Sequence, residues 1–263
     1  MNNIHPSAKI ASDVILGHDI SIAEGVVIDH HAIIHDHVSI AAHSYIGCQC
    51  ILGEYLTDFY QDYENTAHPL TIGPHALLRS GTIIYGDTAI GSHFQTGHRT
   101  TIREKTVIGD HVRLGTMADI QGHCSIGRYV SIHSGVFVAP NSIIEDYVWL
   151  FPHVVLTNDP TPPSDSEKGV TIRRFASVAA RAMILPGLTI GEHALIGAGS
   201  VVTHDVPPGK AAVGTPARVK GDVETIINPD SGEPAYPWPR HFSRGMPWKE
   251  QGYDAWAAQH EAP

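Results

Sequence analysis

Three side chains in the middle of the sequence could take part in proton transfer or hold a polar ligand. His123 can accept a proton near neutral pH, because an unperturbed imidazole titrates there. Asn158 can orient an amine or a sugar through its side-chain amide. Glu145 is a carboxylate at a position where the surrounding pattern has glycine, and departures from a local rule are expected at functional sites. We therefore take these three as the candidate catalytic residues.

Each candidate also has an ordinary structural explanation. His123 is one of 19 histidines and can be a surface residue without a role. Glu145 can be tolerated because its coil lies next to a loop. His98 and His133 are weaker candidates for substrate contact, since either can be hydrogen-bonded within a turn.

A sequence repeat with a period of six residues positions these side chains. Aliphatic residues stand at every sixth position through 10–52, 72–156 and 172–202, with Thr96 as the one exception. Six is the period of neither a helix nor an alternating strand, so it counts the units of a repeat. A second period of 18 is marked by glycines that follow an aliphatic slot, at Gly73, Gly91, Gly109 and Gly127.

The two periods predict an all-β solenoid in which three hexapeptides close one triangular coil. About ten coils stack at ~4.8 Å each, and the aliphatic slots point inward to form the core. We expect Thr96 to be a core residue whose hydroxyl bonds a backbone carbonyl. His123 and Asn158 then follow one column of slots, about 10 Å apart along the axis. Glu145 follows another column and can meet Asn158 only across a subunit interface.

The phase of the repeat divides the chain into three parts. Residues 1–202 form the prism, interrupted by extruded loops at 53–71 and 157–171. Residues 203–222 form a closing loop, and residues 223–263 form a tail rich in proline and tryptophan. We expect the tail to pack against the prism or a neighbouring subunit, with a short helix near 250–260.

The composition narrows the partners and the location. A net charge of −10 argues weakly against nucleic acid or an anionic membrane as the main partner. Three cysteines without a CxxC pair suggest neither a disulfide framework nor a thiolate metal site. The first residues lack a basic and apolar leader, and no apolar run of membrane-spanning length occurs. We expect a soluble cytoplasmic protein.

Several motifs resemble the left-handed parallel β-helix acyltransferases over residues 1–222. They are the hexapeptide ladder and the segments Leu185-Pro186-Gly187, Gly197-Ala198-Gly199-Ser200-Val201-Val202 and Val213-Gly214-Thr215-Pro216-Ala217-Arg218. Within that superfamily, other segments resemble the N-acetyltransferases of nucleotide-linked amino sugars, such as those acting on dTDP-3-amino-3,6-dideoxyhexoses. These are Thr96-Gly97-His98, Ile102-Arg103-Glu104, Asp119-Ile120-Gln121-Gly122-His123, Ile132-His133-Ser134 and Leu156-Thr157-Asn158-Asp159.

The resemblance implies an acetyl-CoA-dependent N-acetyltransferase that acts on the amino group of a dTDP- or UDP-linked amino-deoxy sugar, for surface polysaccharide or glycan biosynthesis. It implies a homotrimer with acetyl-CoA in the cleft between adjacent prisms, and no metal. Some of these enzymes use no protein base. We therefore expect His123 to line the site, and a role for His123 as the base is the weaker expectation.

The resemblance also assigns binding residues. Small side chains at a corner let backbone amides approach the pantetheine arm of coenzyme A, and cations meet its phosphates. It places the 203–222 loop on the coenzyme A side and the 53–71 loop on the nucleotide side. The cofactor residues are Ala180, Ala198, Arg218 and Lys220, and the further substrate residues are Arg103 and Arg79.

Other functions remain open at this point. A zinc lyase of the γ-carbonic anhydrase type shares the prism, but it needs three converging imidazoles, and no obvious spacing supplies them. An acyltransferase of lipid A type would take its acyl group from acyl carrier protein. A sugar O-acetyltransferase or a sugar-nucleotide-binding scaffold would also fit the repeat.

Overall fold

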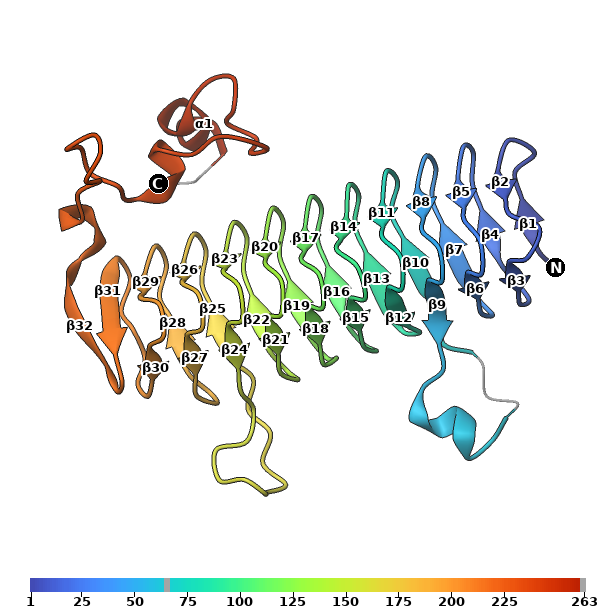
Figure 1. The fold of residues 1–263 in the computed structure, drawn as a ribbon, viewed down its shortest axis with the longest axis horizontal. Coiled ribbons are helices and arrows are strands. Elements are labelled where there is room, and N and C mark those ends of the chain that lie inside the picture. The colour runs from blue at the N-terminus through green and yellow to red at the C-terminus, as the bar shows by residue number, and fades with distance from the viewer. Residues whose placement is uncertain (64–66, 261–263) are drawn as a thin grey trace.

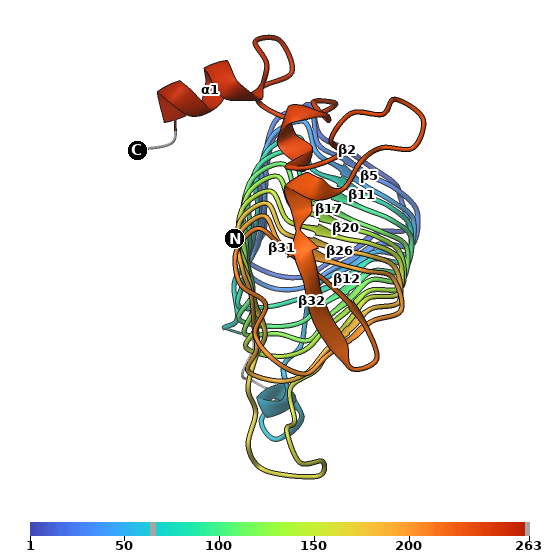
Figure 2. The same ribbon diagram turned by 90° about the vertical axis from the view of Figure 1, so that its left-hand side faces the viewer.

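The computed structural model describes residues 1–63 and 67–260. Its short strands wind into a parallel β-helix with three flat faces, each of which is one sheet (Figure 1 and Figure 2). Most strands pair in register with the strand one coil further along, as Ile102 pairs with Ile120. The sequence period of 18 is therefore one turn of the prism.

We name the sheets A, B and C in the order in which each coil visits them. Sheet A contains β1 (Asn3–Ile4), β4 (Ser21–Ile22), β7 (Val38–Ile40), β10 (Leu70–Ile72), β13 (Thr88–Ile90), β16 (Val107–Ile108), β19 (Ser125–Ile126), β22 (Ile143–Ile144), β25 (Thr171–Ile172) and β28 (Thr189–Ile190). Sheet B contains β2 (Lys9–Ile10), β5 (Val27–Ile28), β8 (Tyr45–Ile46), β11 (Leu77–Leu78), β14 (Gln95–Thr96), β17 (Arg113–Leu114), β20 (Ser131–Ile132), β23 (Trp149–Leu150), β26 (Ser177–Val178), β29 (Leu195–Ile196), β31 (Lys210–Gly214) and β32 (Ala217–Asp222). Sheet C contains β3 (Ile15–Leu16), β6 (Ile33–Ile34), β9 (Ile51–Glu54), β12 (Ile83–Tyr85), β15 (Thr101–Ile102), β18 (Asp119–Ile120), β21 (Phe137–Val138), β24 (Val155–Leu156), β27 (Met183–Ile184) and β30 (Val201–Val202).

The predicted all-β parallel helix is confirmed, and the coil count differs slightly between faces. Sheets A and C have 10 strands each, whereas sheet B has 12 because the hairpin of β31 and β32 adds two. The aliphatic slots along most of the prism are buried in one continuous core.

Thr96 is buried as predicted, but no carbonyl of the described residues accepts a bond from its hydroxyl. Its Oγ1 accepts the main-chain N–H of Arg79 at 3.0 Å and lies 2.9 Å from the hydroxyl of Thr82. The buried hydroxyl of Thr96 thus finds its hydrogen-bond partners in a main-chain amide and a second buried hydroxyl. The predicted carbonyl partner was wrong.

Three corners join the sheets, and we name them AB, BC and CA after the sheets they connect. Many turns place one residue in the left-handed region, such as His123 with a φ of 51°. The glycine slot of corner AB is sterically required where coils stack closely. A Cβ on Gly127 would lie 2.4 Å from the Asp146 carboxylate and 2.6 Å from the main-chain nitrogen of that residue.

Both extruded loops leave the prism at corner CA, on the same side of the molecule (Figure 1). The first loop connects β9 to β10 and contains the short helix η1 (Thr57–Tyr60), while residues 64–66 of the predicted excursion lie outside the described residues. The second loop connects β24 to β25. Between the two loops, the successive turns of corner CA form one edge of the prism, with a loop at each end. We call this part of corner CA the bracketed edge.

The C-terminal tail packs against the prism in an aromatic cluster. It contains η2 (Val223–Thr225), η3 (Trp238–Arg240) and α1 (Tyr253–His260), which agrees with the short helix expected near 250–260. Trp238, Trp248 and Trp256 bury their rings against Tyr147 and Phe175 of corner AB. No helix in the described part of the chain is long and apolar enough to cross a membrane.

Candidate functional site

His123 and Asn158 lie on corner CA, within and at the end of the bracketed edge. His123 is exposed in the turn after β18, and its main-chain N–H donates to the carbonyl of Glu104 at 2.9 Å. Asn158 is half-buried after β24, and its carbonyl accepts the N–H of Lys168 at 2.8 Å, which closes the neck of the second loop. Strand β21 lies between β18 and β24, so the two residues are two coils apart, as the repeat predicts.

Arg103 lies on the same corner, one coil before His123. Its guanidinium donates to both carboxylate oxygens of Glu104, at 3.0 and 2.7 Å, and lies 5.7 Å from the ring centre of Tyr85. Burial raises the pKa of Tyr85, and the negative charge of Glu54 adds to that shift. Arg103 is therefore pre-oriented at the corner, with donors left for an anionic ligand.

Corner BC holds the predicted cofactor alanines and three of the predicted substrate residues. Ala180 and Ala198 stack one coil apart, and the N–H of Gly199 donates to the Ala180 carbonyl at 2.9 Å. His98 occupies the equivalent turn position further toward the N-terminus and is exposed, as is Arg79. Within one chain, this group lies along a different corner from His123 and Asn158.

His133 is the most enclosed histidine of corner BC. Its ring stacks on Phe151 with centres 4.9 Å apart and lies 6.0 Å from Trp149. Burial, with a smaller effect of the nearby Arg113 charge, lowers the pKa of His133, so the ring is neutral at pH 7. Its Nε2 is buried and has no hydrogen-bond partner among the described residues. A neutral ring with a free nitrogen can donate to or accept from a ligand.

Glu145 lies on corner AB, and the structure does not bring it to the other two candidates within one chain. One carboxylate oxygen forms an ion pair with Arg173, and the other accepts the N–H of Arg174 at 3.0 Å. Both oxygens are thus engaged in holding the next coil, which provides a structural reason for a carboxylate in the glycine slot.

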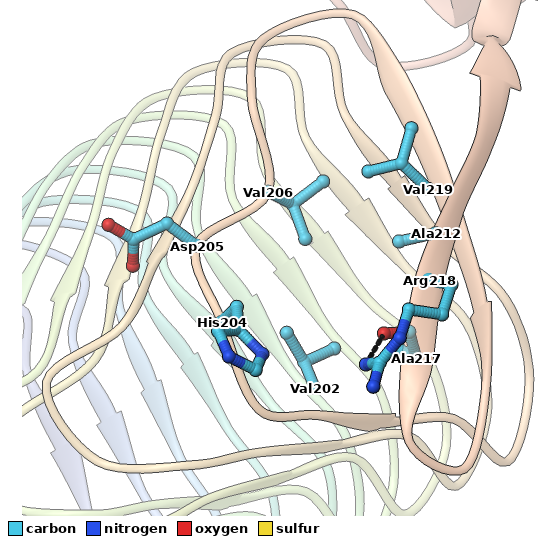
Figure 3. A pocket seen from close by; sticks show the side chains of 8 residues that line it. All are labelled: Val202, His204, Asp205, Val206, Ala212, Ala217, Arg218 and Val219. Carbon is cyan, nitrogen blue, oxygen red and sulfur yellow. Dashed lines mark hydrogen bonds between the residues drawn. The ribbon is translucent and has the colours of Figure 1, made fainter.

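The two predicted phosphate-binding cations lie on the terminal hairpin. Arg218 lines a cavity of about 400 Å³ at the C-terminal end of the prism, together with His204 and Asp205 (Figure 3). Its guanidinium donates to the carbonyl of Ala217 at 2.9 Å. Lys220 is exposed on β32 of the same hairpin.

The outer face of sheet C is an apolar surface that the sequence reading missed. The residue before each inward slot points outward on this face, and it is polar only at Thr101 and Asp119. A buried carboxylate oxygen of Asp119 has no partner among the described residues. A period of 18 in these outward positions would have revealed the surface, which consists of Ile15, Ile33, Ile51, Ile83, Phe137, Val155, Met183 and Val201.

A stack of rings along corner AB was also missed. Neighbouring rings are 4.5 to 5.4 Å apart from centre to centre along the whole stack. Most members of the stack recur every 18 residues, so the spacing of the histidines in the sequence could have predicted it. The stack contains His43, His75, His93, His111, Tyr129, Tyr147, Phe175 and His193.

No group of three histidine, cysteine, aspartate or glutamate side chains in residues 1–63 and 67–260 is placed to hold a metal ion. The three cysteines are free thiols, and burial raises the pKa of both Cys50 and Cys124 to about 11. At neutral pH these two thiols are protonated and are not nucleophiles.

Comparison with known proteins finds repeat-built transferases that resemble parts of the chain. Residues 105–140 match the family model described as bacterial transferase hexapeptide (six repeats). Serine acetyltransferase of Escherichia coli (strain K12) is 36% identical over 110 residues, which cover 42% of this chain and 37% of that protein. The chain therefore spans well under half the length of that relative.

A shorter and closer match concerns a sugar-modifying enzyme. The dTDP-3-amino-3,6-dideoxy-alpha-D-galactopyranose 3-N-acetyltransferase of Aneurinibacillus thermoaerophilus is 50% identical over 52 residues, which cover 20% of this chain and 27% of that enzyme. Among solved structures, PerB from Caulobacter crescentus in complex with CoA and GDP-perosamine is 20% identical. The alignment covers 84% of this chain and 57% of PerB, with a TM-score of 0.25.

Proposed function

We propose that this chain is an acyltransferase of the hexapeptide-repeat family that carries acetyl from acetyl-CoA to the amino group of a nucleotide-linked amino-deoxy sugar. The observation that carries the proposal is the position of His123 and Asn158 on the corner from which both loops leave. The 52-residue match to an amino-sugar N-acetyltransferase supports the nature of the acceptor. We further propose a cytoplasmic location, where acetyl-CoA is available.

The apolar face of sheet C supports a homotrimer. Two of its eight apolar residues are exposed and six are half-buried, and a contiguous apolar face that solvent can reach usually marks a protein interface. Its two edges are corners BC and CA, so three chains that turn sheet C toward a common axis bring corner BC of one chain beside corner CA of the next. The residues separated within a chain, such as His133 and His123, would then line one cleft. Glu145 would lie on the corner away from that cleft, so we assign it the structural role described above.

In this cleft the reaction is an aminolysis of a thioester. The neutral sugar amine attacks the acetyl carbonyl, the new C–N bond forms as the C–S bond breaks, and the leaving coenzyme A thiolate takes up the amine proton. Asn158 orients the amine, and His123 lines the site and can relay the proton. Backbone N–H groups at the corner can donate to the oxyanion.

The two substrates bind to different parts of the cleft. Ala180 and Ala198 leave room for the pantetheine arm, and Arg218 and Lys220 meet the coenzyme A phosphates. In this proposal the neutral ring of His133 and the guanidinium of Arg103 contact the nucleotide sugar. His98 and Arg79 extend this acceptor side toward the first loop.

Mixed trimers test the composite site. Chains blocked at corner CA by His123→Trp are unfolded and refolded together with chains blocked at corner BC by Ala180→Trp, and thiol release from acetyl-CoA is followed. Each block alone should abolish activity, because the bulky ring fills one side of every cleft. Random mixing in equal amounts leaves about a quarter of the clefts with both corners intact, so about a quarter of wild-type activity should return. A site contained in one chain would recover no activity on mixing, which would contradict the proposal.

A further inference from the structure

The imidazole of His68 lies between two carboxylates that belong to different parts of the fold. Its Nδ1 is 3.0 Å from a carboxylate oxygen of Asp87, and its Nε2 is 3.0 Å from one of Asp58. Asp58 belongs to η1 in the first loop, whereas Asp87 is in the corner CA turn between β12 and β13. The ring, whose side chain is 17% exposed, therefore bridges the loop to the prism.

The backbone around this bridge is built for close approach. A Cβ on Gly86 would lie 2.6 Å from both the Cβ and the carbonyl oxygen of His68. Glycine therefore lets the returning loop lie flat on the turn. At the other end of the loop, Tyr55 packs on His35 with ring centres 4.2 Å apart, and Phe59 stacks on Tyr55 at 3.7 Å.

The two bonds set a requirement for the protonation of the ring. Ionised carboxylates only accept hydrogen bonds, and a neutral imidazole carries a single N–H. Both contacts of His68 are satisfied together only when the ring carries two protons. Other charged or titratable groups near the bridge are Glu54 at the end of β9, Asp62 after η1, His37 on the preceding coil and Lys105 beside Asp87.

We propose that His68 is a positioning residue that, as an imidazolium shared by Asp58 and Asp87, holds the first loop against corner CA. As pH rises above about 6.5, where a free imidazole loses its proton, the docked loop binds up to one proton more than the released loop, so docking weakens as pH rises further. The effect on catalysis rests on the proposed function: Asp87 and His123 occupy equivalent turn positions two coils apart, so a docked loop borders the acceptor side.

Amide hydrogen exchange of residues 55–63 tests the bridge without any enzyme assay. Protection factors, corrected for the intrinsic pH dependence of exchange, should fall about tenfold in the wild-type protein between pH 6 and pH 9, because one charge-assisted bond is lost. His68→Gln should show the low value at both pH values. Asp87→Asn is the informative variant: its amide can donate to a neutral ring, so protection should become independent of pH.

Nitrogen-15 NMR of the ring supplies the second measurement, with His68→Gln used to assign the signals. Both ring nitrogens of His68 should be protonated at pH 6. Protection of the loop that does not depend on pH in the wild-type protein, wild-type protection in His68→Gln, or a singly protonated ring at pH 6 would each overturn the proposal. If the enzyme is active as proposed, His68→Gln should raise KM for the amino sugar about fivefold, with kcat nearly unchanged.

Discussion

At the residue scale, His123 and Asn158 hold the acceptor side of the proposed cleft. Asn158→Ala should lower kcat/KM for the amino sugar by about 10- to 100-fold, because the amine loses its orienting group. His123→Ala should lower it about tenfold, mainly through KM, because the residue lines the site. Steady-state thiol release measures both effects.

His93→Ala is the matched control for the histidine. His93 is also an exposed residue in a left-handed turn, with a φ of 56°, but it lies on corner AB. Its kcat/KM should stay within about twofold of wild type. If the His93 and His123 substitutions have the same effect, corner CA is not the acceptor side.

Residue-level partners were only partly predictable from the sequence. The column shared by His123 and Asn158 follows from the period of six, and the structure reproduces it. The bridge at His68 does not follow, because its partners lie 10 and 19 residues away and one of them belongs to a loop without a repeat. The carboxylate of Glu145 broke a visible rule, but its cause, the pairing with Arg173, depends on how the next coil is placed.

At the element scale, the ring stack of corner AB couples pH to stability. Burial lowers the pKa of His111, the neighbouring His93 adds to that shift, and Asp110 opposes it. The unfolded chain therefore binds more protons than the folded chain once pH falls through about 6.5. Stability should decline in that direction.

His111→Tyr tests this coupling, because a tyrosine already follows in the stack at position 129. The loss of Tm between about pH 7 and pH 5 should be smaller in this variant than in the wild-type protein, as measured by circular dichroism. An identical loss in the two proteins would show that the stack contributes nothing to acid sensitivity.

The tail is a second element with its own stability. Trp248 is fully buried, and its Nε1 donates to the Phe242 carbonyl at 3.0 Å. Trp248→Ala should cost about 3–5 kcal/mol of tail docking, because it leaves a cavity within the aromatic cluster. Hydrogen exchange and protease cleavage within 223–260 should accelerate while the prism strands remain protected. Equal acceleration in the prism would contradict a separately docked tail.

Elements were easier to predict than the surfaces between them. The inward slots dictate the prism and the loss of phase marks both loops, because a buried column tolerates few exceptions. The path of the tail follows no period. It is set by contacts of Trp238 and Trp256 with Tyr147 and Phe175, which are far away in sequence.

At the scale of the whole molecule, the outer face of sheet C is the proposed subunit interface. Phe137→Asp should convert the trimer to monomers and abolish activity, because an unpaired carboxylate would be buried at the interface. Sedimentation velocity gives the mass. Val107→Asp on the outer face of sheet A is the control, since that side chain is 58% exposed and should leave the mass unchanged. A trimer that survives Phe137→Asp would place the interface elsewhere.

The central claim is the chemistry, and thiol release from acetyl-CoA tests it most directly. The purified protein is offered a panel of dTDP- and UDP-linked 3-amino and 4-amino sugars, each beside its hydroxyl counterpart. We predict rapid release with one amino sugar and little with the matching hydroxyl sugar. Release with the hydroxyl sugar alone would make the enzyme an O-acetyltransferase. No release across the panel, together with no thermal stabilisation of the protein by acetyl-CoA, would contradict the proposed function.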